Sequence, residues 1–372
     1  MAWRAAAAGG AALEVYADDS YALLAPGGAP WLASGPTAVH VGGAWFSTAA
    51  PPAQPRSLVY SAGFLAAGGD LRVAAPGALT LAAAQAWCTA NASCAGLTYA
   101  GGAGAIPPNS SVYFKEAMSA GVTPNAGWSA YVLAPLPLTR LGASPSGDGS
   151  GYEIRYSANG STPFTASFAL NSSSGAFVFT QRFPLGAAGV ATETPENASS
   201  LGEFASSTTP ATQFPVFVEA PGSPDAAGLG FVSWAGRFFQ ALGAGSGGAA
   251  AAFTAAAGGA EGGPIVLFAG GSGAAGAALV LSPLDNFKSA MLGRAFVANG
   301  SAPGAAGAAA AGVSGYVASL PANFSTSTIA LFGAAGVTDV MHAWGAALRE
   351  HHGGAAKLTD PSSEQLTYWT DK

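Results

Sequence analysis

The only two cysteines of the chain, Cys88 and Cys94, stand six residues apart and are the first candidates for chemistry. Ala84, Trp87 and Cys88 stand at helical spacing (i, i+3 and i+4), so a short helix with an apolar stripe is expected, with Cys88 at its end. A turn should follow, and Leu97–Tyr99 is expected to be a strand. A disulfide between helix and strand would contribute about 2 kcal/mol by restricting the unfolded chain. Two buried free thiols, acting as small apolar residues, are the alternative.

The other nucleophile and cofactor motifs give no site. Cys88 has no histidine base near it in the sequence, and pairing with Cys94 explains it better. The chain contains no G-x-S-x-G, C-x-x-C or P-loop motif. Gly243, Gly245 and Gly248 match a dinucleotide fingerprint in spacing, but no strand–helix frame surrounds them. We therefore expect no catalytic residue and no cofactor.

The four histidines also predict no metal site. His351 and His352 are adjacent, so they point about 100 degrees apart on a helix, and with His342 they have no metal-ligand spacing. They are expected to be solvated side chains at the end of a helix. His40 alternates with two valines and is expected on a surface or in a groove.

Glycoside hydrolysis needs two carboxylates that face each other across a sugar. The nineteen acidic residues are scattered, and only Asp285 and Asp371 stand beside strand ends and aromatic residues. Asp285 is a candidate sugar ligand, but a turn-forming role is the favoured interpretation. Asp371, two residues after Trp369, is a candidate sugar ligand together with that tryptophan if a barrel follows.

Composition excludes several classes of partner. Charged residues make up 9% of the chain, against roughly 25% in ordinary soluble domains. Net charge is −6 without a Lys/Arg cluster, so no nucleic-acid footprint exists. The charge-free interval 240–260 is too rich in Ala and Gly to span a membrane. A surface of Ser, Thr, Gly, Ala and Asn suits a carbohydrate or glycoprotein partner.

Seven of the nine asparagines stand in N-x-[ST] sequons. This enrichment, with two closely spaced cysteines, predicts a secreted or endomembrane-lumenal glycoprotein. A signal peptide is not evident in Met1–Leu13, which lacks a Leu-rich core, so a targeting segment lost upstream or a fragment is expected. The predicted N-glycosylation sites are Asn91, Asn109, Asn159, Asn171, Asn197, Asn299 and Asn323.

Period-two alternation dominates the rest of the chain. Tyr152–Ser157, Phe164–Leu170 and Ala176–Phe183 alternate as half-buried strands do. Tight turns are expected at 18–20 and 42–43. Recurring strands and turns predict a mainly β fold, a large antiparallel β-sandwich. The Ala/Gly stretches 243–259 and 301–312 are expected to be loops without a fixed fold.

One C-terminal helix is predicted, because Val340, Met341, Trp344 and Leu348 share one helical face. Thr338 is expected to be its N-cap, and the glycines at 353–354 should end it.

Residues 61–133 resemble a PAN/apple-like module. The matching segments are AQAWCTANASCAGLTY, VYFKE and GWSAYVL. The resemblance implies a small inserted α+β module, although the second disulfide of many apple modules is absent. Exposed aromatic residues of such a module are candidates for glycan or protein recognition: Trp128, Tyr131 and, outside the module, Trp45.

The remaining chain resembles the N-terminal β-sandwich of α-galactosidase/raffinose-synthase-like glycoside hydrolases. The matching segments are WLASGPTAVHVGGAWFS, FTQRFP, GGPIVLF, LVLSPLDNF, TDVMHAWGAAL and YWTD. The resemblance implies a discontinuous sandwich of residues 11–60 and 142–335, then a linker helix and the start of a missing (β/α)8 barrel at 337–372. The chain is then a non-catalytic region that buttresses or borders a sugar site. The alternative is a standalone glycan- or protein-binding protein.

Overall fold

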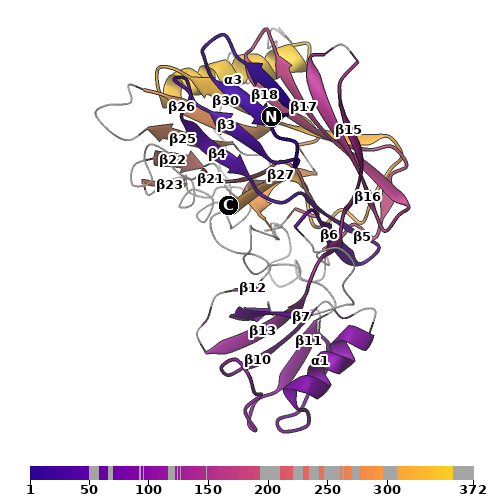
Figure 1. Ribbon diagram of the computed structural model, residues 1–372. Coiled ribbons are helices and arrows are strands. Elements are labelled where there is room, and N and C mark those ends of the chain that lie inside the picture. The colour runs from indigo at the N-terminus through magenta and orange to yellow at the C-terminus, as the bar shows by residue number, and fades with distance from the viewer. Residues whose placement is uncertain are drawn as a thin grey trace, which may run out of the picture.

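The fold is mainly β, as the alternation predicts (Figure 1). The computed structural model describes residues 1–49, 58–65, 70–91, 94, 96–115, 122–123, 125, 127–147, 149–192, 210–220, 229–233, 243–246, 260–261, 264–269, 276–287, 289–295 and 308–354. Within these ranges two helices accompany several sheets. No described helix is both long and apolar enough to cross a bilayer.

The first large sheet combines strands from the two ends of the chain. Strands β1 to β4 form successive antiparallel hairpins, and β4 then pairs with β21, far along the sequence. The order across its eight strands is β1 (Trp3–Ala6), β2 (Ala12–Val15), β3 (Tyr21–Leu24), β4 (Pro30–Ser34), β21 (Val216–Glu219), β28 (Ala308–Val313), β27 (Ala290–Arg294) and β24 (Ala260–Glu261).

The second large sheet contains the strands with the clearest alternation. Its nine strands are ordered β15 (Thr139–Pro145), β16 (Gly151–Ala158), β17 (Thr162–Asn171), β18 (Ala176–Phe183), β30 (Phe324–Gly333), β26 (Ala278–Pro283), β25 (Ile265–Ala269), β22 (Leu229–Ser233) and β23 (Gly243–Ser246). All neighbours are antiparallel. We call the two large sheets together the two-sheet body.

One hydrophobic core joins the two sheets. Buried side chains of both sheets belong to the same cluster. At its centre, the ring of Tyr21 lies 5.3 Å from that of Phe168 and 5.7 Å from that of Phe179. The Tyr21 hydroxyl donates to the carbonyl of Val216 at 2.7 Å, so the polar end of this buried ring is satisfied.

A four-stranded sheet lies beside this core, with β14 (Leu136–Pro137), β6 (Ala44–Ser47), β5 (Ala38–Val41) and β20 (Thr212–Gln213) in that order. Gly42 and Gly43, at φ values of 59° and 79°, form the tight turn between β5 and β6, as predicted. Two consecutive positive φ angles are what a type I′ hairpin turn requires. The short strands β19 (Ala187–Ala188) and β29 (Ser319–Leu320) pair separately.

Residues 58–133, which we call the cystine segment, form a sheet of their own. Helix α1 (Leu81–Ala90) packs on it and begins at Thr80, whose hydroxyl accepts from the amide of Ala83 at 3.2 Å. The order of strands is β7 (Leu58–Ala62), β13 (Trp128–Leu133), β10 (Gly96–Ala100), β11 (Val112–Lys115) and β9 (Asp70–Ala74), while β8 (Phe64–Leu65) pairs with β12 (Val122–Thr123).

The cystine segment interrupts sheets whose strands come from both sides of it. Strand β4 pairs with β21, β5 with β20, and β6 with β14. Figure 1 shows the segment at the lower end of the molecule, away from α3. Three strands differ from the domain bounds expected from the sequence. Strand β1 lies wholly before residue 11, β7 begins at residue 58 and not after residue 60, and β15 begins at residue 139 and not at 142.

Helix α3 (Val337–His351) lies on the outer face of the nine-stranded sheet (Figure 1). Val340 and Ala347 are its buried residues, and Trp344 packs against the sheet between them. The predicted N-cap is wrong, since Gly336 precedes the helix and no side chain caps it. Thr338 is already inside the first turn, where the residue is exposed.

The expectation of unstructured Ala/Gly loops is wrong in two places. Residues 243–246 form β23, and residues 308–313 form the fully buried β28. Close approach explains the composition of β28, because a Cβ at Gly312 would lie 1.5 Å from the carbonyl oxygen of Thr212. Small side chains therefore let β20 pack directly against a central strand. The other predicted loop residues, 247–259 and 301–307, lie outside the described residues.

Candidate functional site

The two cysteines form a disulfide, so neither is a free thiol. The sulfur atoms of Cys88 and Cys94 are 2.07 Å apart, and their Cα atoms 5.2 Å apart. Cys88 ends the buried face of α1, and Cys94 stands just before β10. Both are buried with Leu97 and Tyr99 in the core of the cystine segment. The bond therefore joins helix to sheet across a short turn.

Asp285 has three local partners that explain it. Its Oδ1 accepts from the amide of Ser327 at 2.8 Å, the hydroxyl of Thr326 at 3.1 Å and the side-chain amide of Asn286 at 3.0 Å. These bonds fix the loop after β26 against β30, which is the turn-forming role. The other candidate sugar ligands of this kind, Trp369 and Asp371, lie outside the described residues.

The predicted exposure of two aromatic residues is wrong. Tyr131 and Trp45 are each only 8% exposed. Trp45 packs against Leu65, Ala130 and Val132, where the cystine segment meets the four-stranded sheet. Tyr131 lies instead in the core of the cystine segment, with its ring 6.4 Å from that of Tyr99, so neither ring presents a free face to a ligand.

Trp128 differs from these two residues, because it is only partly buried. Its ring lies 5.9 Å from that of Phe64 and 6.2 Å from that of Tyr113. Successive residues of a strand point to opposite faces of the sheet. Ser129 and Phe114, which follow Trp128 and Tyr113, face α1, so Trp128 and Tyr113 lie on the opposite face. The three rings therefore form a partly exposed aromatic cluster.

The histidines that make contacts serve the fold. The Nδ1 atom of His40 lies 3.0 Å from the Val190 carbonyl, and burial lowers the pKa of this imidazole. His352 bonds through Nε2 to the Leu284 carbonyl at 2.9 Å. Over the part of the chain that the structure describes, no group of three or more His, Cys, Asp or Glu side chains is placed to hold a metal ion.

A partly exposed polar link that the sequence did not reveal joins the two large sheets. The Nε of Arg140 donates to both carboxylate oxygens of Asp19, at 3.0 and 2.8 Å, and the Tyr156 hydroxyl donates to Oδ2 at 3.1 Å. Burial, and then the Asp19 carboxylate, raise the pKa of Tyr156. The sequence indicated only that Asp19 lies in a turn. Its partners Arg140 and Tyr156 are 121 and 137 positions away, so no local pattern connects them.

Five of the seven sequon asparagines lie within the described residues, and none of the five is buried. Asn159 follows β16 and Asn171 ends β17, so these two stand at opposite ends of one strand. Asn91 follows α1, while Asn109 and Asn323 are exposed in turns. Asn197 and Asn299 lie outside the described residues.

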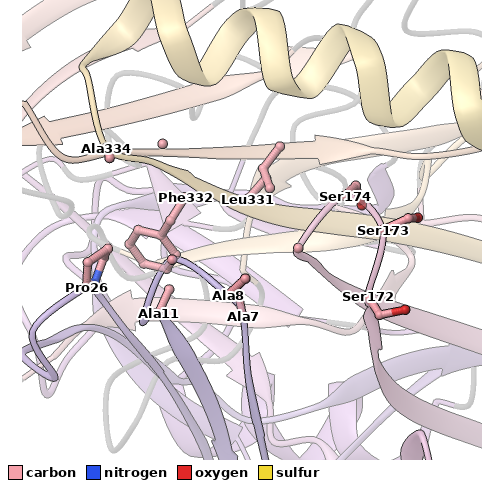
Figure 2. Close-up of a pocket in the computed structure, with 13 residues that line it drawn as sticks. Ala7, Ala8, Ala11, Pro26, Ser172, Ser173, Ser174, Leu331, Phe332 and Ala334 are labelled. Atoms are coloured by element: carbon pink, nitrogen blue, oxygen red, sulfur yellow. The ribbon is translucent and has the colours of Figure 1, made fainter.

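A pocket of about 190 Å³ opens at one end of the two-sheet body (Figure 2). The turns β1–β2, β3–β4 and β17–β18 and the end of β30 surround it. Its residues are Ala7, Ala8, Gly9, Ala11, Pro26, Ser172, Ser173, Ser174, Gly175, Leu331, Phe332, Gly333 and Ala334. Sequence reasoning missed this site, because most of its residues are small and they come from three separate turns and one strand end.

Comparison of the sequence with models of protein families finds no match. A comparison with curated proteins likewise finds no match.

Proposed function

We propose that this chain is the non-catalytic β-sandwich region of a secreted, glycoside-hydrolase-like glycoprotein, and that it buttresses or borders a sugar site on a catalytic barrel. The resemblance of its motifs to α-galactosidase/raffinose-synthase-like enzymes motivates the proposal. The observation that carries it is the engagement of several acidic side chains, within the described residues, in structural bonds. Asp19 is bound by Arg140, and Asp285 by the loop it closes.

Two further acidic side chains have structural partners of their own. Asp70 lies 2.5 Å from the nearly buried ammonium group of Lys115, and Glu14 accepts from the hydroxyl of Tyr16 at 2.8 Å. A glycosidase instead holds two carboxylates across the scissile bond, about 5 Å apart or about 6.5–9.5 Å apart according to mechanism. Acids committed to separate structural partners suit a supporting domain.

The position of α3 supports a linking role. This helix covers the outer face of the nine-stranded sheet, and residues 355–372, which carry the YWTD segment, follow it. In the family that the chain resembles, such a helix leads to the first strand of the barrel. The disulfide and the sequon enrichment support a secreted or lumenal location.

The proposal predicts no hydrolysis by the chain itself. Purified protein should release no aryl alcohol from aryl galactosides or glucosides, and neither should the Asp285→Asn variant. Turnover that Asp285→Asn abolishes would contradict the proposal. Sequencing of the transcript beyond the codon for Lys372 tests the linking role directly, because an open frame with a (β/α)8 pattern is expected.

The second candidate function is a standalone glycan- or protein-binding protein with an apple-like module. The partly exposed aromatic cluster of Phe64, Tyr113 and Trp128 favours it, because aromatic side chains are enriched at binding hot spots. Under this alternative, Trp128→Ala should lower affinity for an immobilised glycan or glycoprotein at least tenfold. Leu141→Ala, an exposed position on β15, is the control. A true stop codon after Lys372 would favour this alternative.

A further inference from the structure

The pocket at the end of the two-sheet body combines apolar walls with a hydroxyl rim. Figure 2 shows Phe332, Pro26 and alanine side chains on one side and the serine turn on the other. None of its lining residues carries a charge. Its volume, about 190 Å³, exceeds the ~150 Å³ of an engineered cavity that admits a six-membered ring. The pocket therefore suits one neutral ring with both apolar and hydroxyl groups.

A sequon asparagine is bonded to the serine turn that lines this pocket. Asn171 precedes the three lining serines, and its Oδ1 accepts from the amide and hydroxyl of Ser173, at 3.0 and 2.6 Å, and from the amide of Ser174 at 3.3 Å. The Ser173 hydroxyl also contacts the carboxylate of Glu350 in the last turn of α3. Because Oδ1 is committed to the turn, Nδ2 is the amide atom left for modification.

Asn159 provides a matched comparison. Its Oδ1 accepts from the amide and hydroxyl of Ser161, at 3.2 and 2.7 Å, which is the same turn geometry. Asn159 is exposed and stands at the other end of β17 from the pocket, whereas Asn171 is half-buried. The two sequons therefore share local geometry and differ in what lies beside them.

We propose that the pocket holds the first N-acetylglucosamine of a glycan attached to Asn171. The sugar ring and its acetyl methyl group match the apolar wall formed by Phe332 and Pro26. The sugar hydroxyl groups match the hydroxyls of Ser172 and Ser174 on the rim. A sugar tethered at Nδ2 binds at high effective concentration, so a small pocket suffices. This inference rests on the secreted location in the proposed function.

The modification is the ordinary transfer of an oligosaccharide to a sequon. A bond forms between Nδ2 of Asn171 and the anomeric carbon of the sugar, and the bond from that carbon to a lipid-linked pyrophosphate donor breaks. The side-chain amide loses one proton, and the lipid pyrophosphate leaves. The chain supplies only the acceptor, and the transferase of the secretory pathway supplies the catalysis.

The test uses the full chain secreted by a eukaryotic host and trimmed by an endoglycosidase to one N-acetylglucosamine at each site. Before trimming, native peptide-N-glycosidase digestion should release the glycan at Asn171 about tenfold more slowly than at Asn159, which corresponds to ~1.4 kcal/mol of protection. The isotope-labelled acetyl methyl resonance at Asn171 should also lie upfield, next to the Phe332 ring. Asn171→Gln and Asn159→Gln assign the two signals.

Ala8→Leu separates sugar binding from simple crowding of the turn. Ala8 is an exposed lining residue outside the sequon, so leucine there fills the pocket without altering Asn171. The expected result is release at the rate of Asn159 and loss of the upfield shift. Three results would each overturn the inference alone. They are equal rates of glycan release at Asn171 and Asn159 in the unaltered chain, a difference in these rates that survives Ala8→Leu, and an unglycosylated Asn171 in a chain that is glycosylated at Asn159. Absence of glycan at every site would overturn the secreted location as well.

Discussion

The two-sheet body and the cystine segment reach stability by different means. The body buries a continuous aromatic core. The ring of Phe179, for example, contacts four others, those of Tyr21, Phe168, Phe214 and Phe217. The cystine segment buries few large side chains and adds a disulfide across six residues. Small units bury a smaller fraction of their surface, so a covalent link matters more to them. We therefore expect the cystine segment, which has the smaller core, to depend on its disulfide for stability.

The largest expected effect comes from the core of the body. Phe179→Ala should cost about 3–5 kcal/mol, because it leaves a cavity among four aromatic rings. Urea denaturation followed by far-ultraviolet circular dichroism measures this loss. Leu141→Ala, at a 56% exposed position of β15, should change the free energy of unfolding by less than about 0.5 kcal/mol. Equal losses in the free energy of unfolding for the two variants would show that the Phe179 ring contributes no more to stability than an exposed side chain.

Removal of the disulfide should come next, with a loss of about 2 kcal/mol by the loop-entropy estimate. The double variant Cys88→Ala, Cys94→Ala should raise amide hydrogen exchange in α1, β10 and β11. Exchange in β17 and β18 should stay unchanged, since the body has its own core. Increased exchange in both regions would show that the cystine segment and the body unfold together.

The polar link between the large sheets should contribute less. Asp19→Asn keeps a residue that tolerates the positive φ of 68° but removes the charge facing Arg140. We expect a loss of about 1 kcal/mol, smaller at high salt, because the Arg140 side chain is 45% exposed. The neighbouring Asp18→Asn, which has only local bonds to Ser20, is the control. A loss that does not depend on salt would show that charge is not the cause.

The smallest effect appears only in alkali and lies in the cystine segment. Burial raises the pKa of Tyr99 from 10.0 to about 12. The fold therefore favours the neutral phenol, and this stabilisation is complete below pH 10 and is lost as the pH rises towards 12. Tyr99→Phe should flatten the decline of the urea midpoint over that interval. An unchanged decline would assign the alkaline sensitivity to other groups, such as Tyr21 and Tyr156, whose pKa values burial also raises.

The same comparison explains what sequence patterns could and could not predict. Period-two runs predicted β16, β17 and β18, because one face of each packs on a core while the other does not. Helical spacing predicted α1 and α3 for the same reason. These patterns show which face of a single helix or strand is buried, and the residues of that element alone are enough to reveal it.

Contacts between distant segments were not predictable. The Ala/Gly composition of 308–313 indicated a loop, but its small side chains allow the close approach of Thr212. Trp45 and Tyr131 were expected to be exposed, and they are buried by segments far along the chain. The pocket beside Asn171 and the Asp19–Arg140 link also depend on turns brought together only by the fold.

Excision of the cystine segment would show whether the two-sheet body folds without it. Leu58 pairs with Leu133, so the ends of the segment lie about one strand spacing, ~5 Å, apart and a short Gly/Ser turn can replace residues 58–133. We predict that the shortened chain keeps a β-type circular dichroism spectrum and a single cooperative urea transition. An aggregated or non-cooperative product would contradict the account of a self-supporting two-sheet body.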